Sequence, residues 1–254
     1  GEALPTFTLE EIDRVSTAPA ETTVWLIGGT SAVGSPVADS LDAAGYTVQR
    51  LGGTNRYDTS RLVAERIAQL AGPGFSGSAF MVNGRAFADG LAVGPVAYAR
   101  AMPVLLTERD TLPAETAAAI LGAGIDDISV VGGTNAVSTG VLAQLGSSAS
   151  RVAAGGNRYQ TASLFAQWAV GQSLATPSWT GIASGIGFPD ALCAGAVIGA
   201  RGGVLLLTSP AELDASASVF IAESRTDIAR ALVFGGPAAV SDAVRSRLYE
   251  VLNP

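Results

Sequence analysis

Short runs of Val, Ile and Leu alternate along this chain with segments whose apolar residues recur at helical spacing. The runs are continuous and lack the apolar–polar alternation of strands that have one face in water. Continuous runs are typical of parallel strands covered by helices on both sides. The pattern therefore predicts an α/β fold with Rossmann-like parallel sheets. The predicted strands are residues 24–27, 46–51, 79–82, 103–107, 128–131, 204–208 and 231–234.

Several motifs return after about a hundred residues, which is the size of a small α/β domain. A strand followed by Gly-Gly occurs three times, whereas the other motifs occur twice. The chain is thus predicted to open midway through a unit and to close at the same kind of point. The repeated segments are residues 50–64 and 151–166, 87–92 and 188–193, and 104–107 and 204–208.

This count predicts about two and a half tandem Rossmann-like modules that pack with pseudo-symmetry. The predicted divisions are an N-terminal segment of a partial first unit (residues 1–21), a first module (22–126), a second module (127–228) and a partial third repeat (229–254).

Composition excludes several classes of function. The 254 residues contain no His and no Lys, and Cys193 is the one cysteine, expected to be a small buried side chain. A Ser-His-Asp triad, a Walker A loop, Schiff-base chemistry and a Cys/His metal site are therefore excluded. The net charge of −7, without a basic block, argues against nucleic-acid binding, and no apolar run reaches the roughly 20 residues of a membrane span. We expect no catalytic residues, no metal and no cofactor.

Each Gly pair stands between a strand and a helix, where backbone N–H groups and the helix dipole favour an anion. The pairs are therefore candidate ligand sites for a phosphate or another acidic group. The alternative is that the glycines only form a tight turn, while Ser or Asn caps the helix. The pairs are Gly28 and Gly29, Gly132 and Gly133, and Gly235 and Gly236.

The tripeptide Asn-Arg-Tyr occurs twice, each time between a strand end and a helix. Open α/β sheets bind ligands outside the carboxyl ends of their strands, and Arg offers a planar fork of donors to a carboxylate or phosphate. The alternative is that Arg pairs with an Asp of the same module and that Tyr packs between modules. The candidate ligand-binding residues are Asn55, Arg56 and Tyr57, and Asn157, Arg158 and Tyr159.

Asp89 and Asp190 stand at equivalent places, each at the start of a helix rich in small residues. An Asp at such a position more often caps the helix or pairs with Arg than acts in catalysis. Two carboxylates a repeat apart also make a poor acid–base pair. We therefore expect both to have a structural or pairing role.

The order of these motifs resembles the type 2 cell-wall-binding repeat of Gram-positive surface proteins. The resemblance rests on Gly-Gly-x-x-Ala-Val-Ser, Gly-x-Asn-Arg-Tyr-x-Thr-Ala, Phe-Pro-Asp-Ala-Leu and a Leu-Leu-Thr strand, and it covers the chain from about residue 22. The second unit matches most closely. In the first unit, Ser60 stands where Ala is usual and Ala88 where Pro is usual.

The resemblance implies a non-catalytic module that is secreted and held at the cell wall or cell surface. Its implied partner is an anionic cell-wall polysaccharide. Family members usually carry three modules in a pseudo-threefold ring. This chain has only two helices that begin with the Asn-Arg-Tyr motif, which corresponds to two modules. A homo-oligomer or a further segment would therefore be needed to complete such a ring.

Two other interpretations stay open. The chain would be a structural or adhesion scaffold if its Arg-Tyr motifs hold modules together, and a nucleotide-binding Rossmann-like protein is the third interpretation. The net charge of −7 also opposes long-range attraction to an acidic polymer. Binding would then rest on contacts within a Debye length, about 8 Å at physiological salt.

Overall fold

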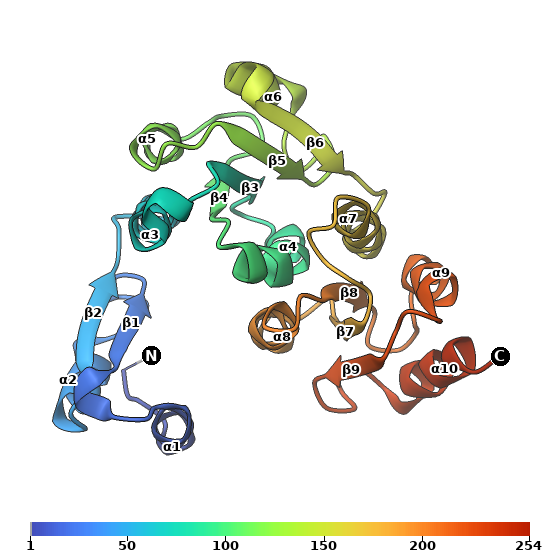
Figure 1. Ribbon diagram of the computed structural model, residues 1–254, viewed down its shortest axis with the longest axis horizontal. Helices are drawn as coiled ribbons and strands as arrows, with labels where there is room; N and C mark the ends of the chain where they lie inside the picture. The colour runs from blue at the N-terminus through green and yellow to red at the C-terminus, as the bar shows by residue number, and fades with distance from the viewer. Residues whose placement is uncertain (1) are drawn as a thin grey trace.

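The structure, a computed structural model, describes residues 2–254 as three α/β units along an arc, with the chain ends at opposite ends of the arc (Figure 1). The first unit contains α1 (Thr6–Val15), β1 (Thr23–Ile27), α2 (Ser35–Ala43) and β2 (Thr47–Leu51). The middle unit contains α3 (Arg56–Ala71), β3 (Ser78–Asn83), α4 (Phe87–Arg100), β4 (Val104–Thr107), α5 (Ala114–Gly122), β5 (Asp127–Val131), α6 (Thr139–Leu145) and β6 (Ala149–Ala153). The third unit contains α7 (Arg158–Gly171), β7 (Trp179–Ser184), α8 (Pro189–Gly199), β8 (Val204–Thr208), α9 (Ala215–Ser224), β9 (Arg230–Phe234) and α10 (Asp242–Leu252).

Every strand pairing is parallel, which confirms the predicted α/β class. The middle sheet has the order β4-β3-β5-β6, the third has β8-β7-β9, and the first has β1-β2. Strands β1, β5 and β9 each lead into a Gly pair, so the first sheet corresponds to the β5–β6 half of the middle sheet. The sheets therefore do not coincide with the sequence repeats. The predicted repeat boundary at residue 127 lies between β4 and β5, which belong to one sheet. The predicted domain divisions and the pseudo-symmetric packing of the repeats stay predictions.

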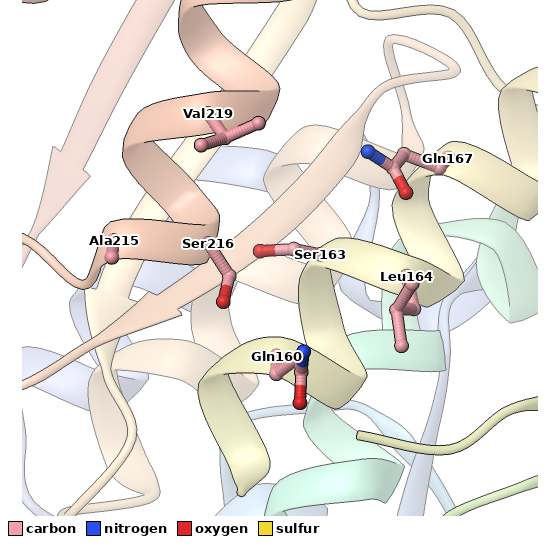
Figure 2. Close-up of a pocket in the computed structure, with 7 residues that line it drawn as sticks. All are labelled: Gln160, Ser163, Leu164, Gln167, Ala215, Ser216 and Val219. Carbon is pink, nitrogen blue, oxygen red and sulfur yellow. The ribbon is translucent and has the colours of Figure 1, made fainter. Parts of the chain in front are cut away.

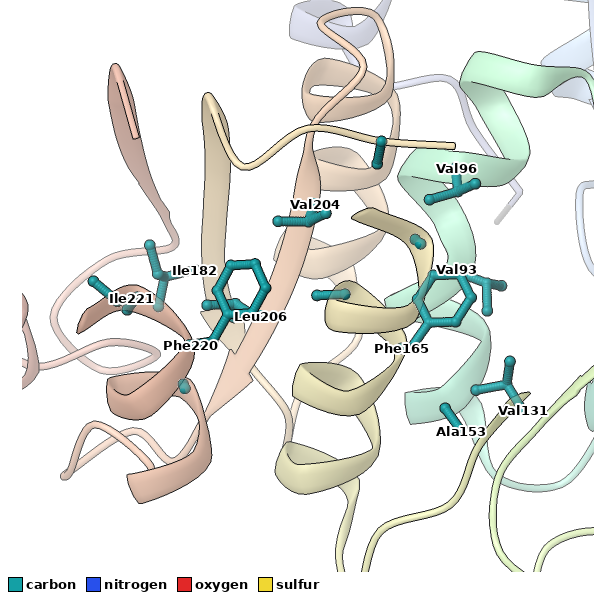
Figure 3. Packing of buried hydrophobic residues seen from close by; sticks show 14 of the residues in the cluster. Val93, Val96, Val131, Ala153, Phe165, Ile182, Val204, Leu206, Phe220 and Ile221 are labelled. Carbon is teal, nitrogen blue, oxygen red and sulfur yellow. The ribbon is translucent and has the colours of Figure 1, made fainter. Parts of the chain in front are cut away.

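One hydrophobic core runs through the middle and third units (Figure 3). Phe80 of β3 and Phe165 of α7 meet edge to face with ring centroids 5.3 Å apart, and both are almost fully buried. Helix α4 packs against α7, α8 and β8. A Cβ added at Gly94 of α4 would lie 3.5 Å from the Cα of Gly195 in α8, so these two helices approach closely. We call this contact between the two units the seam.

The first unit has a smaller core of its own around Leu26, Val37, Leu41 and Tyr46. Its contact with the middle unit includes the Arg66 guanidinium, which lies 4.6 Å from the centroid of the Trp25 ring. The seam, in contrast, buries a continuous set of apolar side chains. The middle and third units are therefore held together mainly by hydrophobic burial.

Phe165→Ala tests how far the two units depend on this shared core. The substitution removes a fully buried ring and is expected to lower the free energy of unfolding by about 3–5 kcal/mol. Chemical denaturation measures the loss. Phe7→Ala is the matched control, because Phe7 is 74% exposed and its removal should change little. Equal effects of the two substitutions would contradict a core shared across the seam.

Candidate functional site

The two Asn-Arg-Tyr motifs begin helices α3 and α7. Asn55 is the N-cap of α3, where its side chain accepts the N–H groups of Tyr57 and Asp58 at 2.9 Å. Asn157 is the N-cap of α7 and accepts the N–H of Gln160 at 2.8 Å. Capping explains why Asn recurs here, and Asn before a helix is the signal that identifies it. The ligand-binding role predicted for Asn55 and Asn157 stays a prediction, and their capping role was not predicted from the sequence.

The Arg and Tyr of each motif hold the loop that precedes α4 or α8. Arg56 donates to the carbonyl of Gly84, and Arg158 donates to that of Gly185, both at 2.6 Å. The Tyr rings lie against the same glycines, since an added Cβ would be 2.7 Å from Cε1 of Tyr57 at Gly84 and 2.6 Å from the equivalent atom at Gly185. The motif thus fixes a loop within its own unit.

Neither arginine is neutralised by an ion pair among residues 2–254, and both are exposed. Arg158 lies at the seam, with its guanidinium carbon 5.7 Å from the centroid of the Phe87 ring. Arg56 lies at the equivalent place on the open side of the middle unit. The guanidinium nitrogens that do not meet the glycine carbonyls are therefore the groups available to an anion.

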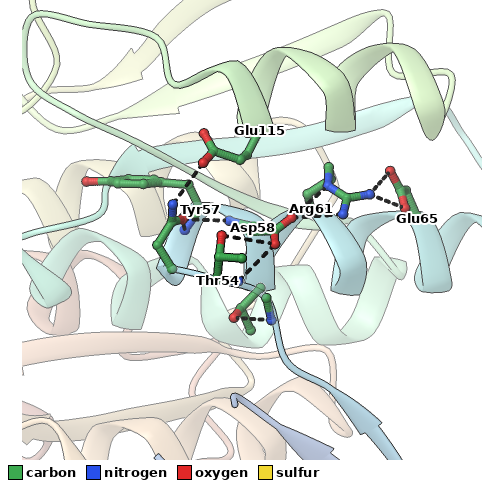
Figure 4. A network of polar contacts seen from close by, with 9 residues as sticks. Thr54, Tyr57, Asp58, Arg61, Glu65 and Glu115 are labelled. Carbon is green, nitrogen blue, oxygen red and sulfur yellow. Dashed lines mark hydrogen bonds and ion pairs between the residues drawn. The ribbon is translucent and has the colours of Figure 1, made fainter. Parts of the chain in front are cut away.

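Tyr57 has a hydrogen-bond partner for its hydroxyl, whereas Tyr159, the equivalent residue, has none in the described chain. Its hydroxyl donates to Glu108 at 2.6 Å, and Arg85 donates to the same carboxylate from Nε at 2.7 Å. The Arg85 and Tyr57 hydrogen bonds lower the pKa of Glu108 to about 2. A second polar network joins α3 to α5, in which Arg61 bridges two carboxylates of α3 and Asn55 donates to a carboxylate of α5 (Figure 4).

The first glycine of each Gly pair has a backbone conformation that other residues rarely adopt. The φ angles are 114° at Gly28, 113° at Gly132 and 106° at Gly235. A tight turn follows, and the helices begin only at Ser35, Thr139 and Asp242. The helix N–H groups are thus several residues away from the glycines. The structural role of the first glycines is clear, and a ligand role for the Gly pairs stays a prediction.

The carbonyl of each of these first glycines accepts a hydrogen bond from an arginine for which no role was predicted from the sequence. The arginine comes from the following strand in the first and middle units and from the following helix in the third. The donors are Arg50 at 2.8 Å to Gly28, Arg151 to Gly132, and Arg245 at 3.1 Å to Gly235.

Asp89 and Asp190 lie in the first turns of α4 and α8, where Ala86 and Phe188 hold the N-cap positions. Their carboxylates face the Gly pair of the neighbouring strand. A Cβ at Gly132 would be 2.5 Å from Oδ2 of Asp89, and Gly235 has the same relation to Asp190. The aspartate carboxylates therefore lie in close contact with the loop after β5 or β9.

Asp89 is only 8% exposed, and this burial raises its pKa to about 6, although the positive charge of Arg158 across the seam acts in the opposite direction.

No group of acidic, Cys or His side chains within residues 2–254 could hold a metal ion. None of the described helices is long and apolar enough to cross a membrane.

The middle unit carries an open groove of about 920 Å³. In the third unit, α4 covers Leu205 and Leu207 of β8, which are at most 1% exposed. Counted back from the Thr that ends each strand, their equivalents in β4 are Val104 and Leu106, and both are only partly buried. No described helix covers them as α4 covers β8, so they line the groove together with α3 and with Gly28.

The face of α8 that corresponds to the buried face of α4 is also uncovered. Leu91 of α4 is 6% exposed, whereas its equivalent Leu192 is 62% exposed and borders the groove. Cys193 lies on this face and is exposed. The expectation that Cys193 is buried is therefore wrong, because nothing in the described chain packs on α8 as the third unit packs on α4.

Comparison with protein families gives a match to the cell wall binding domain 2 (CWB2) at residues 50–142 and again at 152–245. N-acetylmuramoyl-L-alanine amidase LytC of Bacillus subtilis (strain 168) is 31% identical over 225 residues, which are 89% of this chain and 42% of that protein. The amidase enhancer of the same strain is 38% identical over 90 residues, which are 35% of this chain and 12% of that protein.

Two solved structures from Clostridium difficile share the fold. Cwp8 has a TM-score of 0.82 at 23% identity, and the match covers 98% of this chain and 41% of that one. Cwp6 has a TM-score of 0.79 at 21% identity and covers 97% and 38%. The chain thus spans less than half the length of the relatives it matches.

Asp89→Asn is expected to change the pH dependence of stability. With a pKa of about 6 in the folded protein against an ordinary value of 3.8, Asp89 binds its proton more readily when folded. The stability that protonated Asp89 contributes to the folded protein is therefore fully present below pH 4, and it is lost as the pH rises through 6. The variant should gain stability relative to the parent across this window, by up to about 3 kcal/mol.

Chemical denaturation of both proteins at pH 4, 5, 6 and 7 measures this gain. Asp110→Asn is the control for the general effect of removing a negative charge, because Asp110 lies on the surface. A stability difference that stays constant from pH 4 to 7 would show that the buried charge of Asp89 has no cost.

Proposed function

Because the chain belongs to the cell wall binding domain 2 (CWB2) family, we propose that it is a non-catalytic module that anchors a secreted protein to the Gram-positive envelope. The observation that carries the proposal is the pair of consecutive family matches, which together span most of the chain. The amidase activity named for LytC is not part of the proposal, since the chain covers less than half of that protein. The chain also offers no His or Lys for catalysis.

The proposed partner is an anionic cell-wall polysaccharide. Two arginines at equivalent places, Arg56 and Arg158, support it, because both are exposed and neither has an ion-pair partner in residues 2–254. Arg61, Arg85 and Arg247, in contrast, are each paired with a carboxylate. The net charge of −7 makes these contacts short-ranged, so binding should weaken as salt rises.

The hydrogen bonds of Arg56 and Arg158 to glycine carbonyls favour a second role for the same motif, which is to support the fold. The two roles are compatible. One nitrogen of each guanidinium is fixed on the protein, which reduces the entropy lost when the other nitrogens bind an anion.

A pull-down on purified Gram-positive cell walls tests the proposal. The protein should bind intact walls and should bind far less after the anionic polymers are removed. Binding that ignores their removal would rule out an anionic partner. Failure to bind any wall preparation would rule out anchoring.

The double variant Arg56→Ala and Arg158→Ala belongs in the same experiment. We expect tenfold or greater loss of wall binding, together with a loss of stability of about 1 kcal/mol for each glycine contact. Arg225→Ala, which removes an exposed arginine outside the motifs, should leave both unchanged. If stability falls and wall binding does not, the motif is structural and the polymer binds elsewhere.

The open groove bears on the homo-oligomer suggested by the repeat count. We propose that it receives a helix of the α4 type from a further repeat, whose Asp in the first turn would meet Gly28 as Asp89 meets Gly132. A second copy of this chain fits less well, because its own Asp190 already lies against Gly235.

Sedimentation velocity over a wide range of concentrations distinguishes these partners. The chain alone should sediment as a monomer. A concentration-dependent dimer that Leu106→Asp abolishes would instead support a second copy in the groove.

A further inference from the structure

The gap between two helices is filled by a charged network in the middle unit, whereas the equivalent gap in the third unit holds a cavity. In the middle unit Arg61 of α3 donates to Asp58 at 2.8 Å and to Glu65 at 2.8 Å, and Asn55 donates to Glu115 of α5 at 2.8 Å (Figure 4). Counted from the start of each helix, the equivalents of Asp58, Arg61, Glu65 and Glu115 in the third unit are Gln160, Ser163, Gln167 and Ser216.

These four neutral side chains leave a cavity of about 300 Å³ between α7 and α9 (Figure 2). No charged side chain lines it. Its remaining walls are Ala215 and the aliphatic side chains of Leu164 and Val219. A site that carries a charged network in one unit is thus a neutral polar cavity in the next.

Ser163 is the unusual member of this cavity. It is 3% exposed, and its Oγ has no hydrogen-bond partner. Figure 2 shows the hydroxyl pointing from α7 across the gap toward Ser216 of α9. A buried hydroxyl without a partner destabilises the fold, so its presence favours a group that enters the cavity and bonds to it.

The gap also has polar groups on its rim. The side-chain oxygen of Gln160 accepts the N–H of Gly156 at 2.6 Å, which leaves its amide nitrogen as a donor toward the cavity. Gln167, whose amide nitrogen donates to Glu223 of α9 at 3.5 Å, and Ser216 add an amide oxygen and a hydroxyl on either side. The combination of neutral donors, neutral acceptors and an aliphatic wall matches the hydroxyl groups and C–H face of a sugar ring, and it offers no cation to a phosphate or carboxylate.

We propose that the cavity between α7 and α9 binds a neutral sugar unit of a cell-wall glycan, with Ser163 as the central hydrogen-bonding group. This inference rests on the proposed wall-binding function and assigns part of that binding to a site away from Arg56 and Arg158. Neutral recognition is not opposed by the net charge of −7. It therefore supplies contacts that an acidic protein can make to a wall polymer at any salt concentration.

Two variants test the site on the full chain. Ser163→Ala removes the hydroxyl and should weaken wall binding by about three- to tenfold, while stability stays the same or rises because an unpartnered buried polar group is lost. Ser163→Arg combined with Gln167→Glu rebuilds the pair that fills the middle unit and should abolish this part of the binding with the fold intact. Ser218→Ala, in the same helix but in the lining of a different cavity, is the matched control and should bind like the parent.

Two measurements are needed, which are pull-down on purified walls at high salt and NMR titration of each variant with glucose and N-acetylglucosamine. The parent should show shifts of the Ser163 and Gln167 amides that the filled variant lacks. If the parent binds walls and the Ser163→Arg, Gln167→Glu variant binds equally well, the proposed sugar site is wrong and the proposed wall-binding function stands. If the parent fails to bind walls and shows no shifts with either sugar, both are wrong.

Discussion

The structure depends on the burial of α4 between two sheets. This helix belongs to the middle unit by its chain connections, yet its apolar face is buried by α7, α8 and β8 of the third unit. Because the burial is shared, neither unit can expel water from its core without the other. The close approach of Gly94 and Gly195 shows how small residues permit this packing. The groove on the open side of the middle unit is the equivalent surface on β4, where no described helix takes the place that α4 has on β8.

Loops at the carboxyl ends of the strands are held by a recurring set of contacts. Asn caps the helix, Arg and Tyr enclose a glycine of the next loop, and Asp meets the Gly pair of the neighbouring strand. Each contact requires a residue type that also suits ligand binding, which is why the motif invites two interpretations. In the structure the Asn side chain, one guanidinium nitrogen and the Tyr ring of each motif support the fold, while Arg56 and Arg158 are exposed residues.

The two units that share this design have diverged where the design permits it. The helix pair α3–α5 carries an arginine–carboxylate network, whereas the cavity between α7 and α9 is lined by neutral side chains around an unpartnered hydroxyl, with Gln167 bonded to Glu223 beside it. Both helix pairs pack on the equivalent strand, β4 or β8, so the difference lies in the side chains that face the gap. Such positions are where a repeat protein can acquire binding specificity in one unit without disturbing the packing of the other.

The sequence alone determined the α/β class, the parallel strands and the family, because continuous apolar runs and motifs that recur in order are local properties of the chain. It did not determine the roles of individual residues. The capping role of Asn55 was not predicted, and Cys193, which was predicted to be buried, lies on the open face of α8. Nor could it place the sheets, which are out of phase with the repeat. These features depend on which units lie side by side, and burial between units separated by a hundred residues is decided only by tertiary packing.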